Sequence, residues 1–97
     1  MATFVSLINW TEEGIHNFAD TVKRNDDAKA LAERLGGRLE HSYWTVGQYD
    51  LVTVADFPDD ETATAFLLAV GGGGHVRTTT LRAYDAGEVS AIVGKVT

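Results

Sequence analysis

The stretch that decides the fold is GGRLEHSYWTVGQYDLVTVAD, residues 36–56. Two glycines suited to ending a helix are followed by two largely apolar segments, which we expect to form strands over residues 38–46 and 49–56. Gly47 and Gln48 lie between them and suit a two-residue type II′ turn, which favours glycine at its first position. The stretch therefore predicts a β-hairpin placed directly after a helix.

The segments before this hairpin supply a strand and a helix. Residues 3–10 are apolar at both alternating sets of positions, a pattern typical of a central strand that is covered on both faces. A helix is expected to begin at Asn25 or Asp26 and to end at Gly36, because apolar residues recur there at helical spacing. Residues 11–24 between them are expected to hold one helical turn and a short connector.

The segments after the hairpin repeat the order. Pro58 ends the last hairpin strand, and Asp59 or Asp60 is expected to cap a helix that runs to about Val70. A threonine-rich strand follows over residues 75–84, and residues 85–88 form a capping box for a short C-terminal helix. This order predicts an α+β fold: a ferredoxin-like βαββαβ sandwich with the first and third strands central and two helices on one face.

Length, composition and charge exclude several classes of function. The 97 residues make one domain, residues 1–97, and the net charge of −6 with eight scattered basic residues argues against a nucleic-acid partner. The absence of cysteine excludes disulfides and thiolate chemistry. No apolar run approaches the roughly 20 residues of a membrane span, and the first residues do not resemble a signal peptide. We therefore expect a cytoplasmic protein without a membrane partner.

The faces of the predicted sheet indicate self-association. The expected hairpin register sets Tyr43 opposite Val52 and His41 opposite Val54, and both faces of the sheet are substantially apolar. Two helices cover only one of those faces, and a bare apolar sheet face exceeds what a monomer normally exposes. The sequence thus predicts a homodimer or a higher homo-oligomer.

Several short motifs together resemble the GYD-domain family, small bacterial proteins of the dimeric α/β-barrel type. The resemblance covers nearly the whole chain, which departs from the family pattern in its four consecutive glycines and in a histidine where an asparagine is more usual. It implies architecture and little mechanism. The motifs that carry it are Gly14-Ile15, Gly36-Gly37, Gly47-Gln48-Tyr49-Asp50, Phe57-Pro58-Asp59 and the segment from Val76 to Tyr84.

The hairpin also supplies the candidate site residues. The register places His41, Tyr43 and Asp50 on one face, where they are the expected polar contacts of a ligand cavity, with His41 able to exchange protons near neutral pH. The alternative is structural: Gly47, Tyr49 and Asp50 form a turn motif in which Asp50 accepts backbone N–H groups. We favour the structural role for Asp50.

Other candidates are weaker. The three histidines (His16, His41 and His75) match no metal-ligand spacing, so neither a metal site nor a cofactor is expected. The glycines of residues 71–74 lack the features of a nucleotide-binding loop, and we interpret them as a connection. Trp10, Phe18, Tyr43 and Trp44 could line a pocket for an apolar or aromatic ligand, or serve as core and interface residues.

Three classes of function remain open. The first is a homo-oligomeric small-molecule-binding or sensor module. The second is a cofactor-independent enzyme, a monooxygenase or isomerase acting on an apolar substrate, for which the support is analogy of fold. The third is a purely structural assembly subunit.

Overall fold

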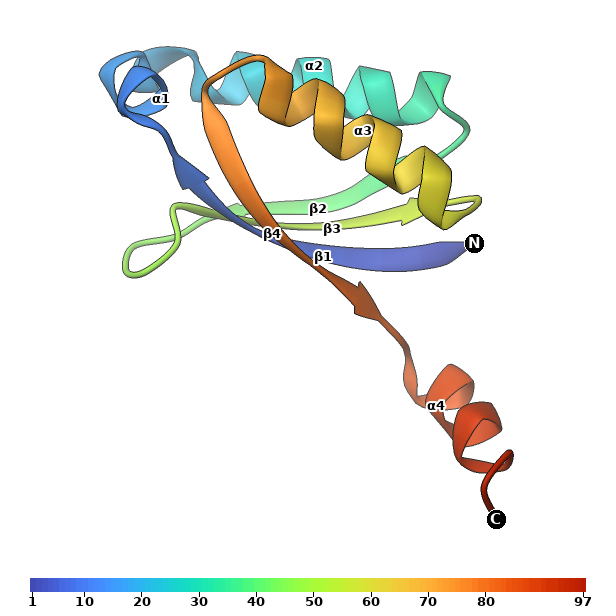
Figure 1. The fold of residues 1–97 in the computed structure, drawn as a ribbon. Helices are drawn as coiled ribbons and strands as arrows, with labels where there is room; N and C mark the ends of the chain where they lie inside the picture. The colour runs from blue at the N-terminus through green and yellow to red at the C-terminus, as the bar shows by residue number, and fades with distance from the viewer.

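The computed structural model describes all of residues 1–97 (Figure 1). Its four strands form one antiparallel sheet in the order β2-β3-β1-β4, so that the first and third strands are central, as predicted. This confirms the ferredoxin-like α+β fold. The elements are β1 (Ala2–Trp10), α1 (Glu12–His16), η1 (Phe18–Asp20), α2 (Thr21–Arg34), β2 (Arg38–Trp44), β3 (Leu51–Phe57), α3 (Asp60–Gly72), β4 (Val76–Ala83) and α4 (Ala86–Val93).

The core lies between the sheet and two helices. Helices α2 and α3 both lie on the same face of the sheet (Figure 1). Strand β3 alternates buried and half-buried residues along its whole length, which shows one face against the helices and the other left open. The buried residues that cluster between the layers are Ala32, Leu39, Ala55, Phe57, Ala63 and Phe66.

Helix α2 begins one turn earlier than its sequence predicts. It starts at Thr21, and Asn25 lies within the first turns instead of capping them. The reason is tertiary. The Asn25 Oδ1 atom accepts a hydrogen bond from Ser42 Oγ at 2.9 Å, and Thr21 Oγ1 accepts one from Trp44 Nε1 at 2.9 Å. Both bonds join the start of α2 to β2, and local sequence patterns do not reveal them.

The hairpin connection is longer than the expected two-residue turn. Strands β2 and β3 end at Trp44 and begin at Leu51, so residues 45–50 form the loop. Gly47 has a φ of 141°, so the prediction of a glycine at positive φ is confirmed, while the type II′ turn is wrong. The Asp50 N–H donates to Ile8 O on β1 at 2.9 Å, while the Asp50 carbonyl still accepts the Thr45 N–H at 2.9 Å.

A β-bulge in β2 shifts the strand register at the end of the hairpin away from the loop. The expected pairs Tyr43–Val52 and His41–Val54 are both present, but Leu39 pairs with Ala55 because the register shifts between Leu39 and His41. One extra residue in β2 lets Leu39 lie buried against the helices while His41 lies exposed on the open face.

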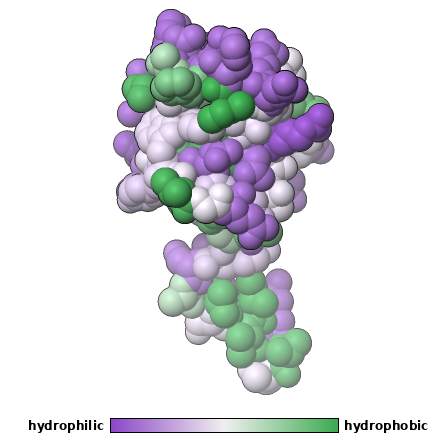
Figure 2. All heavy atoms as spheres, turned by 90° about the vertical axis from the view of Figure 1, so that its left-hand side faces the viewer, coloured by the Kyte–Doolittle hydropathy of each residue, from purple (hydrophilic) through white to green (hydrophobic).

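The C-terminal helix α4 stands apart from the rest of the molecule. It follows β4 and projects on the side of the sheet opposite α2 and α3 (Figure 1), and the molecule measures 51 Å along its longest axis. The predicted capping box is present, with Asp85 and Glu88 each bonded to the other's backbone N–H. The surface of α4 is dominated by apolar side chains (Figure 2), among them Val89, Ile92 and Val93. None of the helices has the length and apolarity that crossing a lipid bilayer requires.

Candidate functional site

A cavity of about 340 Å³ lies between the sheet and helices α2 and α3, and we call it the helix–sheet cavity. Its lining is mainly apolar and includes Ile8, Trp10, Leu31, Leu51, Phe66 and Val70. The polar side chains of the lining are Ser6, Thr53 and Thr78 on the floor, Thr21, Arg24, Asn25, Asp27 and Arg34 from α2, and His75 just before β4. Ligand sites typically have about 300–1,000 Å³ and this mixture of apolar walls and a few polar groups.

Near His75, which lines the cavity, α1 contacts the segment just before β4. Thr11 caps α1 by accepting from Gly14 N at 3.1 Å, and its hydroxyl also donates to Gly74 O at 2.5 Å. The Thr11 N–H donates to His75 O at 3.0 Å. Thr11 therefore anchors the chain segment from which the His75 side chain enters the cavity wall.

Gly14 makes this contact possible because it has no side chain. A β-carbon at position 14 would lie 1.9 Å from His75 O, well inside any permitted contact distance. The buried Gly14 thus lets the α1 backbone approach the α3–β4 connection directly. This gives a physical reason for glycine in the Gly14-Ile15 motif.

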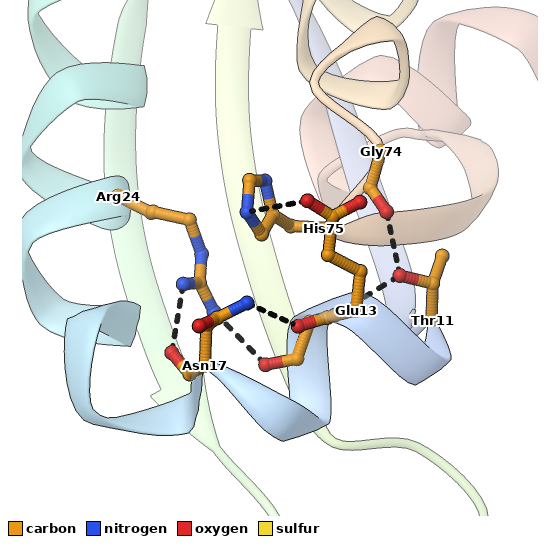
Figure 3. A network of polar contacts seen from close by, with 7 residues as sticks. Thr11, Glu13, Asn17, Arg24, Gly74 and His75 are labelled. Carbon is orange, nitrogen blue, oxygen red and sulfur yellow. Dashed lines mark hydrogen bonds and ion pairs between the residues drawn. The ribbon is translucent and has the colours of Figure 1, made fainter.

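Arg24 and His75 face the same end of the cavity from different elements. Figure 3 shows Arg24 reaching down from α2 toward Asn17, with His75 extending toward it from the start of β4. Arg24 Nη1 donates to Asn17 O at 2.9 Å and Nη2 to Gly14 O at 3.4 Å. His75 Nε2 lies 3.8 Å from Glu13 Oε1, which is too long for a hydrogen bond. The two side chains thus place an arginine cation and an imidazole in the lining of the cavity.

Trp10 in the cavity wall carries an unsatisfied polar atom. Its Nε1–H is buried and has no hydrogen-bond partner in the structure, which costs about 1–3 kcal/mol. Unpaired buried donors are rare in folded proteins and are found preferentially where function retains them. Trp10 was one of the aromatic residues that the sequence offered as pocket lining, and it does line the cavity.

The structure brings together only two of the three predicted site residues. The rings of His41 and Tyr43 stack with centroids 6.0 Å apart on the open sheet face, away from the helix–sheet cavity. Asp50 lies in the loop just before β3, and its Oδ2 atom accepts a hydrogen bond from the backbone N–H of Trp10 at 2.9 Å. The predicted placement of all three on one strand face is therefore wrong for Asp50, because its carboxylate ties the loop to β1.

The other candidates lie apart from one another. The structure contains no group of three His, Asp or Glu side chains that could hold a metal ion, and His41 and His75 lie on different faces of the sheet. Arg82 stacks over the rings of Tyr84 and Phe4, with its guanidinium 4.3 and 5.6 Å from their centroids. Phe18 is 62% exposed and is absent from the cavity lining.

Sequence reasoning overlooked Arg24. Acidic residues precede it by four positions and follow it by three, a pattern typical of ordinary ion pairs on a solvated helix face. In the structure Asp27 pairs with Lys23 instead, at 3.3 Å. The signal that distinguishes Arg24 is its half-buried position in the cavity wall, which only the folded chain shows.

Two comparisons with known proteins support this architecture. A relative from Thermus thermophilus, named glutamine synthetase and cystathionine beta-lyase binding protein, is 29% identical over 92 residues, covering 94% of this chain and 97% of its own. The crystal structure of TTHA0845 from the same organism has a TM-score of 0.56 at 24% identity, covering 89% of this chain and 96% of that one.

A third similarity concerns the fold alone. A solved protein provisionally named a chlorite dismutase, TA0507, has a TM-score of 0.57 at 14% identity, and the match covers 96% of this chain but 48% of that chain. The GYD domain family itself matches residues 4–93, nearly the full length of the sequence. The chain therefore belongs to the GYD domain family, as its glycine, Tyr-Asp and Val-Arg motifs indicated.

Proposed function

We propose that this protein is a homo-oligomeric binding module that holds a small molecule in the helix–sheet cavity. The observation that carries the proposal is the cavity itself: about 340 Å³, with a mainly apolar surface and with polar side chains that include Arg24 and His75. Its volume and its mainly apolar lining fall within the range of small-molecule sites, which supports the proposal.

The second part of the proposal is that another copy of the chain covers the open sheet face. This face carries Val5, Leu7, Val52 and Val54, all only half-buried, and Leu81, which is 49% exposed. Association of two such faces would remove this apolar surface from water, which is the main driving force for dimer formation. Helix α4 projects on the same side and would add its own apolar residues to the contact.

His41 and Tyr43 belong to this second surface. Their stacked rings lie on β2 beside Val52 and Val54, so a second sheet packed on this face would bury them. We assign them to polar contacts within the assembly, or with a ligand enclosed between two sheets. Replacing His41 with Gln and Tyr43 with Phe distinguishes the two: a ligand site loses affinity with assembly intact, whereas an interface loses assembly.

A second candidate function is the binding of metabolic enzymes. The observation that favours it is the name of the Thermus relative, which is described as binding glutamine synthetase and cystathionine β-lyase. The test is direct mixing of this protein with each of those purified bacterial enzymes in an analytical ultracentrifuge. A faster-sedimenting species in either mixture would support it, and unchanged sedimentation of both components would reject it.

Native mass spectrometry of freshly purified protein tests the main proposal. We expect a dimer or higher multiple of the chain, together with a small non-covalent mass that is lost under denaturing conditions. The filled-cavity variant Ala28→Trp, on the α2 wall, should keep the oligomeric state and lose the bound mass. A bare monomer at micromolar concentration, with no added mass, would contradict both parts of the proposal.

A further inference from the structure

Arg24 is a half-buried cation in the wall of the helix–sheet cavity, and its charge has no acidic partner. Its guanidinium donates only to two neutral groups, the backbone carbonyls of Asn17 and Gly14. Arg34 also borders the cavity, but it is exposed, so water solvates its charge. The chain has fourteen acidic residues against eight basic ones, so a carboxylate partner for Arg24 would have been easy to supply. The isolation of this half-buried cation therefore requires an explanation.

Two carboxylates of this region face other basic groups. Asp27, which also lines the cavity, pairs with Lys23 at 3.3 Å, and Glu13 faces His75 Nε2 at 3.8 Å. Figure 3 shows the Arg24 guanidinium near the His75 ring, and its bonded partners belong to α1 and to Asn17, which follows it. No ion pair within 4 Å joins Arg24 to either acid.

Removing a charged group partly from water costs free energy, and an opposite charge held close to it offsets that cost. Guanidinium carries five N–H donors in a planar fork, and the fork matches a carboxylate in two parallel hydrogen bonds. The two carbonyls account for two of those donors. The remaining donors and the full positive charge are left for a group that is absent from the chain itself.

We propose, on the basis of the binding function above, that the cavity takes a small organic anion: a carboxylate held by Arg24 and an apolar body packed among Ile8, Leu31 and Phe66. The carboxylate of the ligand provides the negative charge that pairs with Arg24, and the apolar walls of the cavity bind the apolar part of the ligand. The His75 imidazole lies at the same end and is placed to give a further hydrogen bond to the carboxylate. Inorganic anions fit less well, because they leave the apolar walls empty.

Titration calorimetry with matched pairs of compounds tests this inference. Each pair shares one apolar body and differs in one group: 3-phenylpropanoate against 3-phenylpropanamide, hexanoate against hexanamide, and 4-methylpentanoate against its amide. We expect the best-fitting carboxylate to bind at least about tenfold more tightly than its amide, as a charge-assisted pair provides. Phosphate alone should bind at most weakly.

Variants assign the preference to Arg24. Arg24→Gln should abolish the difference between carboxylate and amide while leaving the affinity for the amide unchanged. Arg24→Lys should retain a smaller preference for the carboxylate over the amide. This variant tests the role of the charge even if the Gln variant fails to fold. Arg38→Gln, the same change on a solvent-exposed arginine of β2 that lies outside the cavity lining, should retain the full preference.

The outcomes separate this inference from the proposed function. If the amides bind as tightly as the carboxylates, the cavity is a binding site but the anion inference is wrong. If Arg38→Gln removes the preference and Arg24→Gln does not, the assignment to Arg24 is wrong. If no compound of any pair binds, the binding function fails together with the inference.

Discussion

At the scale of single residues, Gly14 has the most sharply defined role. A methyl group at this position would meet His75 O at 1.9 Å and Trp10 Cβ at 3.2 Å, so α1 and the start of β4 would have to separate. We expect Gly14→Ala to lower the free energy of unfolding by about 3 kcal/mol, the upper range for overpacking. Urea denaturation of both proteins measures the difference.

The matched control for this prediction is Gly71→Ala. Gly71 is helical, lies near the end of α3 and has nothing within 4 Å of a built β-carbon. Because alanine favours the helix over glycine, we expect this variant to be unchanged or more stable by about 0.5–1 kcal/mol. Equal stability of the Gly14 and Gly71 variants would show that the α1–β4 approach is looser than described.

Asp50 provides a second prediction at this scale. Its carboxylate accepts the Trp10 N–H at 2.9 Å, and its own N–H donates to Ile8 O, so it joins the hairpin loop to β1. We expect Asp50→Ala to lower the free energy of unfolding by about 1–3 kcal/mol, because the backbone N–H of Trp10 loses its acceptor. Asp50→Asn, which retains an acceptor oxygen, should cost less.

Binding measurements on these variants then separate the two interpretations of Asp50. A structural Asp50 lowers thermal stability in both variants and leaves the affinity of the folded protein for a cavity ligand unchanged. A variant that keeps full thermal stability but loses affinity for the ligand would instead show that Asp50 contributes to the ligand site.

At the scale of elements, the N-terminus of α3 predicts a pH dependence. Asp59 caps the helix, with Oδ1 accepting from Thr62 N at 2.7 Å, and this backbone hydrogen bond, followed by one from the Thr62 side chain, lowers the pKa of the Asp59 carboxyl below its ordinary value. Because folding favours the ionised form, the stabilisation is complete above the unfolded pKa near 4. It is lost as the pH falls through the lower folded value.

The measurement compares Asp59→Asn with the natural protein by denaturation across the pH range. We expect the stability difference to be constant above about pH 5 and to shrink as the pH falls below about 4. Asp60→Asn is the control, since the Asp60 carboxylate does not cap the helix. A difference between Asp59→Asn and the natural protein that stays the same down to about pH 2 would show that the charge on Asp59 is irrelevant to the cap.

At the scale of the whole molecule, the open sheet face predicts the oligomeric state. Val54 lies on β3 with Val5 and His41 as its neighbours across the strands, and its side chain points away from the helices. We expect Val54→Lys to convert the assembly to monomers, since a lysine buried between two sheets would be an unpaired charge. Sedimentation velocity at micromolar concentration measures this.

Leu68→Lys is the matched control for assembly. Leu68 is 72% exposed on α3, on the helical side of the sheet, so the same substitution there should leave sedimentation unchanged. Both variants should keep a native circular dichroism spectrum, because neither side chain belongs to the core cluster. Persistent assembly of Val54→Lys would place the contact between copies elsewhere on the molecule.

Local sequence patterns were sufficient to predict the order of elements, the central positions of β1 and β3, the cap at Asp85 and the glycine at positive φ in the hairpin loop, and they narrowed the cap of α3 to Asp59 or Asp60. These features depend on residues within a few positions of one another: apolar periodicity, N-cap side chains and glycine conformation. Of the four aromatic residues that the sequence offered as pocket lining or as core and interface, only Trp10 lines the cavity.

The length of the hairpin loop, the bulge in β2 and the site depended instead on contacts between distant parts of the chain. Asp50 pairs with Trp10 across 40 positions, and Ser42 with Asn25 across 17, so the competition between local and distant partners could not be resolved from local patterns. The same holds for Arg24, since Asp27 three positions further on pairs with Lys23 in the folded chain. Hydrogen bonds and charges are satisfied by whichever partner the completed fold brings within about 3 Å, and that choice is made by the whole chain.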